Sequence, residues 1–166
     1  DPYITDWKDA KAVPLADGDF GLDDYIEYLV KFMETLGPGT HMVATCQAAP
    51  PAMVAAAILA KRNPACVPAS LTLMAGPVDI RVNPNFIGKM TDKLPQKMFR
   101  ALNVNTIPPG NPGSGRRVYP GFYQLTSFMA MNLKSHASRY GGFAKDIATG
   151  NSDEADAFRE FYDEYF

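Results

Sequence analysis

Cys46 lies in the run ATCQA at residues 44–48, between a predicted strand and a predicted helix. Residues 42–45 are predicted to form a short apolar strand. Pro50 and Pro51 are predicted to open an alanine-rich helix that runs to about residue 62, because proline suits the first helical turn, where its missing N–H has no partner. A helix N-terminus favours the thiolate, which is the nucleophilic form of cysteine. The pattern therefore predicts attack by Cys46 on an acyl carbon.

The same run has the arrangement of a nucleophile elbow, the strained strand-to-helix turn that usually reads Gly-x-Ser-x-Gly. The turn brings neighbouring segments close together, so it needs small residues two places before and two places after the nucleophile. Ala44 and Ala48 fill both places. The backbone N–H of Gln47 is expected to donate to the developing oxyanion, a role worth about 3 kcal/mol per donor. We therefore predict Cys46 and Gln47 as catalytic residues, against the alternative that Cys46 is simply a packed core cysteine.

A cysteine nucleophile needs a base, and the sequence contains two histidines, His41 and His136. Five residues of strand separate His41 from Cys46, roughly 16 Å at about 3.3 Å per residue, and the pleat sends the two side chains to opposite faces. His136 lies in a predicted helix, and we expect it on a solvated face. Elbow enzymes carry nucleophile, acid and histidine in that order, so we expect the histidine beyond residue 166.

Other reactive residue types have simpler structural explanations. Asp79 follows a predicted strand at residues 69–75, where an acid could orient the base, but a strand-ending turn is the preferred interpretation. Cys66 lies in a loop before that strand and is predicted to be structural. Arg116 and Arg117 cannot supply the many phosphate contacts that nucleic-acid binding requires. For this pair we expect a loop clamp or a salt bridge.

The composition excludes several classes of function. Sixteen Lys and Arg residues against 18 Asp and Glu give a net charge of -2, which provides no field to recruit nucleic acid or anionic lipid. A neutral or apolar substrate is expected. The longest apolar stretch, residues 52–60, is too short for a membrane span, and no leader pattern opens the chain. Two cysteines do not make a disulfide framework, so we expect a cytoplasmic location. No metal or cofactor is predicted.

The order of predicted elements indicates an α/β fold. A helix with apolar residues at helical spacing is predicted at residues 22–36, followed by the strand, helix and strand described above. Strand, helix and strand with short links are typical of a parallel sheet with crossover helices. A further short, buried strand is predicted at residues 3–5.

After residue 82 no strand pattern returns. Helices are predicted at about residues 122–139 and from residue 152, with a Pro/Gly-rich loop at residues 107–115. We therefore predict two parts, a partial core over residues 1–82 and a helical lid or insertion over residues 83–166. The lid is expected to pack over the carboxyl edge of the sheet, where α/β proteins bind their ligands.

Aromatic residues recur at helical spacing near the end of the chain. They are Phe158, Phe161, Tyr162, Tyr165 and Phe166. A helix with such a face needs another surface to cover it. We therefore expect this chain to be a piece of a larger protein, with missing parts of the same chain or homo-oligomer contacts as its partners.

Six ordered blocks together resemble the intracellular polyhydroxybutyrate depolymerases, a family of α/β-hydrolases. The blocks are YITDW at residues 3–7, FGLDDYI at 20–26, CQ at 46–47, LMAGPVDIR at 73–81, VYPGF at 118–122 and FYDEY at 161–165. The resemblance implies that Cys46 is the nucleophile of an enzyme that breaks stored polyester into short 3-hydroxybutyrate oligomers and monomer. It also implies a cytoplasmic enzyme that acts on polyhydroxybutyrate granules.

The resemblance has two qualifications. The family has proline directly after the Cys-Gln pair, whereas Ala48 stands there in this chain, so the local turn is expected to differ. The family's acid and histidine also lie downstream of residue 166, and its early strands precede residue 1. This chain alone is therefore expected to be inactive.

Two other functions stay open on the sequence. One is a polyhydroxyalkanoate synthase-like acyl transferase, since such enzymes also place a cysteine in a lipase-type elbow; release of CoA with chain growth would identify it. The other is a non-catalytic polyester-binding module in which Cys46 only packs. Labelling of Cys46 by iodoacetamide no faster than a free thiol would favour that module.

Overall fold

The computed structural model describes residues 1–79, 81–82, 89 and 93–165, with backbone only at 164 and 165. The chain divides into two compact units. One is Val13–Asn85, and the other combines Asp1–Ala12 with Phe86–Phe166. The predicted roles of residues 1–82 as a hydrolase core and of residues 83–166 as a lid stay predictions.

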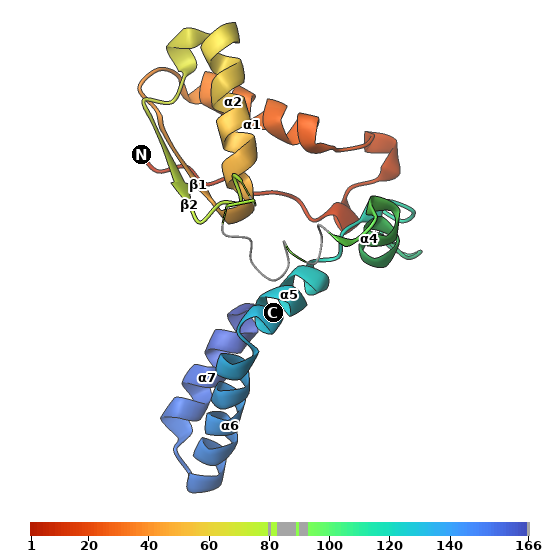
Figure 1. The fold of residues 1–166 in the computed structure, drawn as a ribbon, viewed down its shortest axis with the longest axis vertical. Helices are drawn as coiled ribbons and strands as arrows, with labels where there is room; N and C mark the ends of the chain where they lie inside the picture. The colour runs from red at the N-terminus through yellow and green to blue at the C-terminus, as the bar shows by residue number, and fades with distance from the viewer. Residues whose placement is uncertain (80, 83–88, 90–92, 166) are drawn as a thin grey trace. The chain divides into compact units, whose positions relative to one another are not determined.

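A strand–helix–strand motif forms the centre of the unit Val13–Asn85 (Figure 1). Strand β1 (His41–Thr45) is followed by helix α2 (Ala49–Arg62) and strand β2 (Ser70–Met74). The two strands pair in parallel, with His41 opposite Ser70 and Thr45 opposite Met74. Parallel neighbours need a crossover of a dozen or more residues, which α2 and its flanking turns supply. The predicted order of strand, helix and strand is confirmed.

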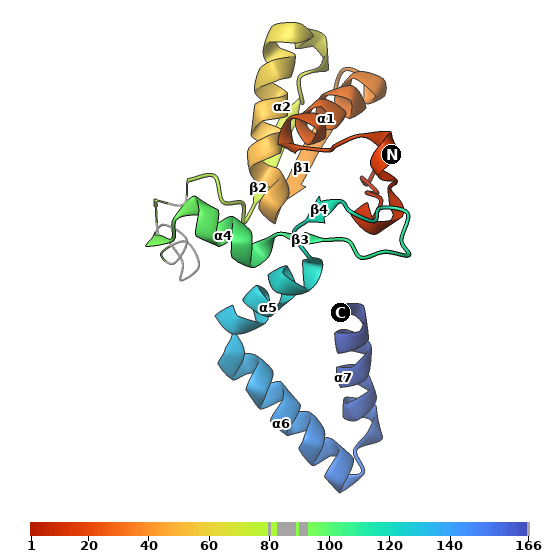
Figure 2. The ribbon, with the colours of Figure 1, turned by 90° about the vertical axis from the view of Figure 1, so that its right-hand side faces the viewer.

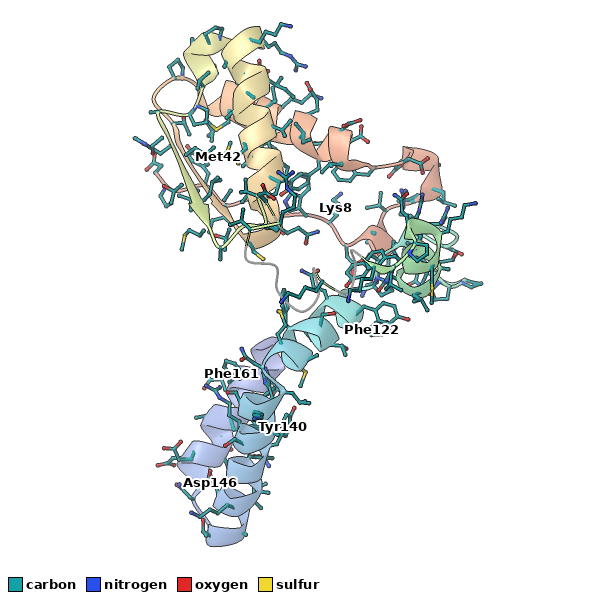
Figure 3. The ribbon with its side chains drawn as sticks, in the orientation of Figure 1. Lys8, Met42, Phe122, Tyr140, Asp146 and Phe161 are labelled. Atoms are coloured by element: carbon teal, nitrogen blue, oxygen red, sulfur yellow. The ribbon has the colours of Figure 1, made fainter. Side chains whose placement is uncertain are left out.

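Helix α1 (Leu22–Leu36) packs against α2 and closes the core of this unit. The two helices and the loop before β2 contribute the buried cluster Ile26, Leu29, Val30, Met33, Ala55, Leu59 and Cys66. Met42 of β1, labelled in Figure 3, packs against this cluster. Burying each large aliphatic side chain contributes roughly 1.5–3 kcal/mol. Cys66 is thus a core residue, as predicted.

The strands bury only one face within this unit. Met42 and Ala44 of β1 alternate with His41, Val43 and Thr45, and only the first two are covered. Ala44 is 4% exposed, whereas Val43 is 65% exposed. Successive side chains on a strand point to opposite faces, so the core lies on the face that carries Ala44.

The other unit is mainly helical in its described residues. Its elements are α4 (Gln96–Asn103), β3 (Asn105–Thr106), β4 (Arg117–Val118), α5 (Gly121–Met131), α6 (Leu133–Thr149) and α7 (Ser152–Tyr165). The described residues also include 3-10 turns at Ala10–Ala12 in this unit, and at Leu15–Asp17, Cys46–Ala48 and Pro64–Cys66 in the other. In the described part of the chain, every helix is too short or too polar to cross a membrane.

Helices α6 and α7 form an antiparallel hairpin, seen from the side in Figure 2. Gly150, in the left-handed conformation at φ 73°, ends α6 and allows the chain to reverse. Aromatic rings fill the contact, and Phe143 of α6 stacks on Phe158 of α7 at 4.3 Å between ring centroids. The predicted helix start at Ser152 is confirmed. The side chain of Tyr165 and the whole of Phe166 lie outside the described residues.

Two cation–π contacts join the same helices in opposite directions. The guanidinium of Arg139, on α6, lies 5.0 Å from the ring centroid of Phe161 on α7. The guanidinium of Arg159, on α7, lies 5.9 Å from the ring of Phe143 on α6. Figure 3 labels Tyr140 and Phe161 on the two helices. The aromatic stripe of α7 is therefore covered in part by α6 of the same chain.

Three expectations about secondary structure are wrong. Residues 3–5 form no strand, and Ile4 is 93% exposed, because β-rich residues need a partner strand to form one. Strands do return after residue 82, since β3 and β4 pair antiparallel, but at two residues each they are too short to show a pattern. The helix predicted at residues 122–139 is broken at Asn132, which ends α5 with φ -126° and ψ 33°.

Candidate active site

Cys46 lies directly after β1 and opens the 3-10 turn Cys46–Ala48, which continues into α2. Its φ is 55°, in the left-handed region. That conformation costs an L-residue other than glycine about 1–2 kcal/mol. The side chain is exposed, whereas Cys66 is buried. A strained, accessible cysteine at a strand-to-helix turn is the geometry that a nucleophile elbow requires.

Local sequence explains why the chain turns here. Thr45 keeps the extended conformation, at φ -105° and ψ 136°, so the strand ends one residue before the cysteine. The N–H of Ala49 then donates to the carbonyl oxygen of Cys46, which closes the 3-10 turn. Pro50 and Pro51 lie at the start of α2, where proline is compatible with helix. The turn and the helix N-terminus therefore follow the cysteine without a gap.

A second turn, after β2, lies against the first one. Ala75 has φ 52° and is, with Cys46, one of two non-glycine residues with positive φ among the described residues. A Cβ added at Gly76 would lie 2.1 Å from the Cβ of Ala49 and 3.1 Å from the carbonyl oxygen of Cys46. The backbone after β2 therefore touches the turn that carries Cys46.

Sequence reasoning missed Gly76 and Ala49. It looked for small residues two places either side of Cys46, and Ala44 is indeed buried at 4% exposure. The residue that lies closest to the neighbouring turn, however, is Ala49, three residues after the cysteine, which is 0% exposed and packs against Gly76. A glycine directly after a predicted strand was the signal available in the sequence, because such glycines often mark close backbone approach.

The carboxylate of Asp79 is held by Arg81. Arg81 Nε donates to Oδ1 at 2.8 Å, Nη2 donates to Oδ2 at 2.7 Å, and the Arg81 backbone N–H donates to Oδ1 at 3.0 Å. The side-chain hydrogen bonds from Arg81 are the main cause that lowers the pKa of Asp79 below its ordinary value, and the backbone hydrogen bond adds to this effect. The two residues thus form a closed local pair, which agrees with a strand-ending turn.

The structure does not bring His41 to Cys46. His41 opens β1 while Cys46 follows its last residue, so the two lie at opposite ends of the strand. The Nδ1 of His41 is 2.7 Å from Oγ of Ser70, its cross-strand partner. The sequence argument against His41 as the base is therefore confirmed.

The expectation that His136 lies on a solvated face is wrong. Its Nδ1 is 2.8 Å from the hydroxyl oxygen of Tyr162, which is 6% exposed. His136 is half-buried and joins α6 to α7. A histidine on an otherwise polar helix segment takes this position because the facing helix offers a hydroxyl partner.

Arg116 is buried, at 9% exposure, next to the short strands β3 and β4. Its backbone N–H donates to Gly113 and its carbonyl accepts from Ile107. These backbone hydrogen bonds place Arg116 within a folded loop, and a loop clamp or salt bridge by its side chain stays a prediction. In the described residues no group of three or more His, Cys, Asp or Glu side chains could hold a metal ion.

A parallel strand–helix–strand unit with a cysteine at positive φ at its first turn defines a mixed α/β protein. The family model described as PHB de-polymerase C-terminus matches residues 75–166, more than half of the 166 residues. The chain belongs to this polyhydroxybutyrate depolymerase family, which confirms the resemblance. The match includes Asp79 but neither Cys46 nor Gln47. No curated protein and no solved structure matches the chain significantly.

Proposed function

We propose that this chain carries the nucleophile of an enzyme that hydrolyses the ester bonds of polyhydroxybutyrate. The observation that supports this most strongly is the exposed Cys46 at φ 55° between β1 and α2. Family membership supports the polyester as the substrate class. In this proposal residues 1–82 are part of an α/β-hydrolase core, and residues 83–166 are its helical lid or insertion.

In the proposed reaction the thiolate of Cys46 attacks the ester carbonyl carbon and forms a C–S bond. The backbone N–H of Gln47 donates to the resulting oxyanion. The C–O bond then breaks, and a histidine protonates the leaving alkoxide. The histidine, now neutral, takes a proton from the water that adds to the thioester; the C–S bond then breaks and releases the carboxylic acid product and the thiolate.

The geometry argues against His41 as the base of this reaction. Within Val13–Asn85 the one histidine is His41, which lies at the far end of β1 from Cys46 and contacts Ser70. We propose that a histidine other than His41 acts as the base. The proposed cellular location is the cytoplasm, at polyhydroxybutyrate granules. The uncharged polymer of these granules suits a chain of net charge -2.

The test is the Cys46→Ala variant of the full protein, assayed for release of 3-hydroxybutyrate from polyhydroxybutyrate. Removing a nucleophile typically lowers kcat by about 10⁴-fold or more. Cys66→Ala is the matched control, because it removes the other thiol and affects the core rather than the turn. Turnover by Cys46→Ala within tenfold of the parent (about 1.4 kcal/mol of barrier), with an unchanged circular dichroism spectrum, would refute the assignment.

A second assay on the full protein distinguishes hydrolysis from the two alternative functions. If incubation with hydroxyacyl-CoA releases CoA and lengthens polymer, the elbow belongs to a synthase-like acyl transferase instead. The non-catalytic module is less well supported, because it requires Cys46 to be packed and the thiol is exposed.

A further inference from the structure

We propose that Gly76 is a positioning residue for the elbow. Because it has no side chain, Cys46 and Ala49 can occupy their observed positions beside it. This inference rests on the proposed function, in which Cys46 is the nucleophile. Gly76 lies two residues after β2 and comes from a different turn than the cysteine. Its contact with the elbow is therefore tertiary, brought about by the parallel pairing of β1 and β2.

The need for glycine at residue 76 comes from space alone. The φ of Gly76 lies outside the left-handed region, so positive φ is not the reason for glycine there. A Cβ there, however, would lie 2.1 Å from Cβ of Ala49. Carbon atoms in contact normally lie about 3.5–4.0 Å apart, so one of the two turns would have to move by more than 1 Å (about the shortfall in contact distance).

Of the two turns, the one that carries Cys46 would be disturbed by such a displacement. Ala49 is the first residue of α2, and its N–H donates to the carbonyl oxygen of Cys46. That same oxygen lies 3.1 Å from the Cβ position at Gly76. Pushing on Ala49 and on this oxygen therefore rotates the peptide that links Cys46 to Gln47. The thiol and the proposed oxyanion donor would move together.

Catalysis is sensitive to displacements of this size. A misplacement of about 1 Å at a reacting group can lower the rate about 100-fold. We therefore expect Gly76→Ala to lower kcat for ester cleavage in the full protein by about 10-fold to 100-fold, with KM changed less than about threefold. Binding of the polymer away from the elbow is untouched by the change.

Ala49→Gly supplies the compensating change, because it removes the atom that the new methyl group would meet at 2.1 Å. The double variant Gly76→Ala/Ala49→Gly should recover kcat to within about threefold of Ala49→Gly alone. Recovery is expected to be incomplete, since the Cβ at residue 76 still lies 3.1 Å from the Cys46 oxygen. Ala49→Gly would also relieve any loss of stability that the clash causes, so the comparison uses kcat of the folded variants and not stability alone.

Gly37→Ala is the matched control for backbone stability. Gly37 has φ 85° and nothing within 4 Å of its Cβ position, so alanine is strained there without touching the elbow. Gly37→Ala should lower the melting temperature and leave kcat unchanged. Gly76→Ala should lower kcat by more than its melting temperature explains.

A readout that does not depend on chemistry separates this inference from the proposed function. The ¹³Cα and ¹³Cβ shifts of cysteine report backbone conformation, and Cys66 in the core serves as the internal reference. We expect the Cys46 signals to move in Gly76→Ala and to return in the double variant, with Cys66 unchanged. This result would support the positioning role even if Cys46→Ala retained turnover and the nucleophile assignment failed.

Three results would overturn the inference. They are unchanged Cys46 shifts in a folded Gly76→Ala protein, unchanged kcat in that variant, and failure of Ala49→Gly to restore either one. If Gly76→Ala does not fold, the double variant still decides the question. A double variant that also fails to fold, or folds without recovered kcat, would show that contact with Ala49 is not the reason for glycine.

Discussion

Thr45 and Met74 are directly paired at the carboxyl ends of β1 and β2, and each is followed by a residue with positive φ. Those residues are Cys46 at 55° and Ala75 at 52°. Two strained turns therefore leave the same edge of the parallel pair side by side. The carboxyl edge is where α/β proteins bind their ligands, so the strain is concentrated at the place where the site is proposed.

The strain at Ala75 predicts that glycine is better tolerated there than alanine. Ala75→Gly should raise the free energy of unfolding by about 1 kcal/mol, because glycine adopts positive φ without steric cost. Ala48→Gly is the control, since Ala48 has φ -74° and glycine there only adds chain entropy. Urea denaturation monitored by circular dichroism measures both. Equal destabilisation by the two substitutions would mean that Ala75 is not strained.

Within the unit Val13–Asn85, we expect truncation of Leu59 to cause the largest loss of stability. It is 0% exposed and lies between α1 and the loop that carries Cys66 in the core cluster. Leu59→Ala should lower the free energy of unfolding by about 2–5 kcal/mol, through lost burial and the cavity left behind. Val54→Ala, on the same helix but 44% exposed, should change it by less than about 0.5 kcal/mol. Urea titration of both variants compares the two losses.

The hydrogen bond between His136 and Tyr162 predicts a measurable link between α6 and α7. Tyr162→Phe removes the hydroxyl 2.8 Å from Nδ1 and leaves a half-buried histidine without that partner. The free energy of unfolding should fall by about 1 kcal/mol or more. Tyr140→Phe is the control, because Tyr140 is 43% exposed and its hydroxyl can be solvated. Equal effects of the two changes on thermal unfolding would show that the bond contributes nothing.

The ion pair between Glu27 and Arg62 predicts an acid-dependent loss of stability. Arg62 Nη1 donates to Oε1 of Glu27 at 2.6 Å and so joins α2 to α1. This hydrogen bond lowers the pKa of Glu27 below 4.5. Because the folded pKa is depressed, the contribution is present above the unfolded pKa and is lost as pH falls through the folded one.

Glu27→Gln should therefore be less stable than the parent at pH 7, and the difference should shrink as pH falls below the ordinary pKa of Glu, because protonation of Glu27 removes the ion pair. The effect is small, because both side chains are exposed. Salt at about 1 M should shrink the difference at pH 7 through screening. A difference that grows on acidification would contradict the assigned sign.

Periodicity predicted most of the unit Val13–Asn85. The apolar residues of α1 recur every three or four positions, and the prolines of α2 mark its first turn, so both helices were found within a residue or two. The position of Cys46 at the strand-to-helix turn also followed from sequence. Its positive φ did not, because an ordinary residue in the left-handed region leaves no local signature.

Contacts between distant residues were the part that sequence could not supply. The hydrogen bond from His136 to Tyr162 spans 26 residues, and the approach of Gly76 to Ala49 depends on the register of two strands. The absence of a strand at residues 3–5 has the same cause, since pairing depends on a partner elsewhere in the chain. Tertiary partners decided these features, and local composition did not.

The reciprocal stacking of Arg139 on Phe161 and of Arg159 on Phe143 locks the register of the α6–α7 hairpin. Sliding one helix by a single turn, about 5.4 Å, would pull both cations off their rings at once. The two contacts therefore favour one register of the hairpin, and both must break before α6 and α7 can slide past one another.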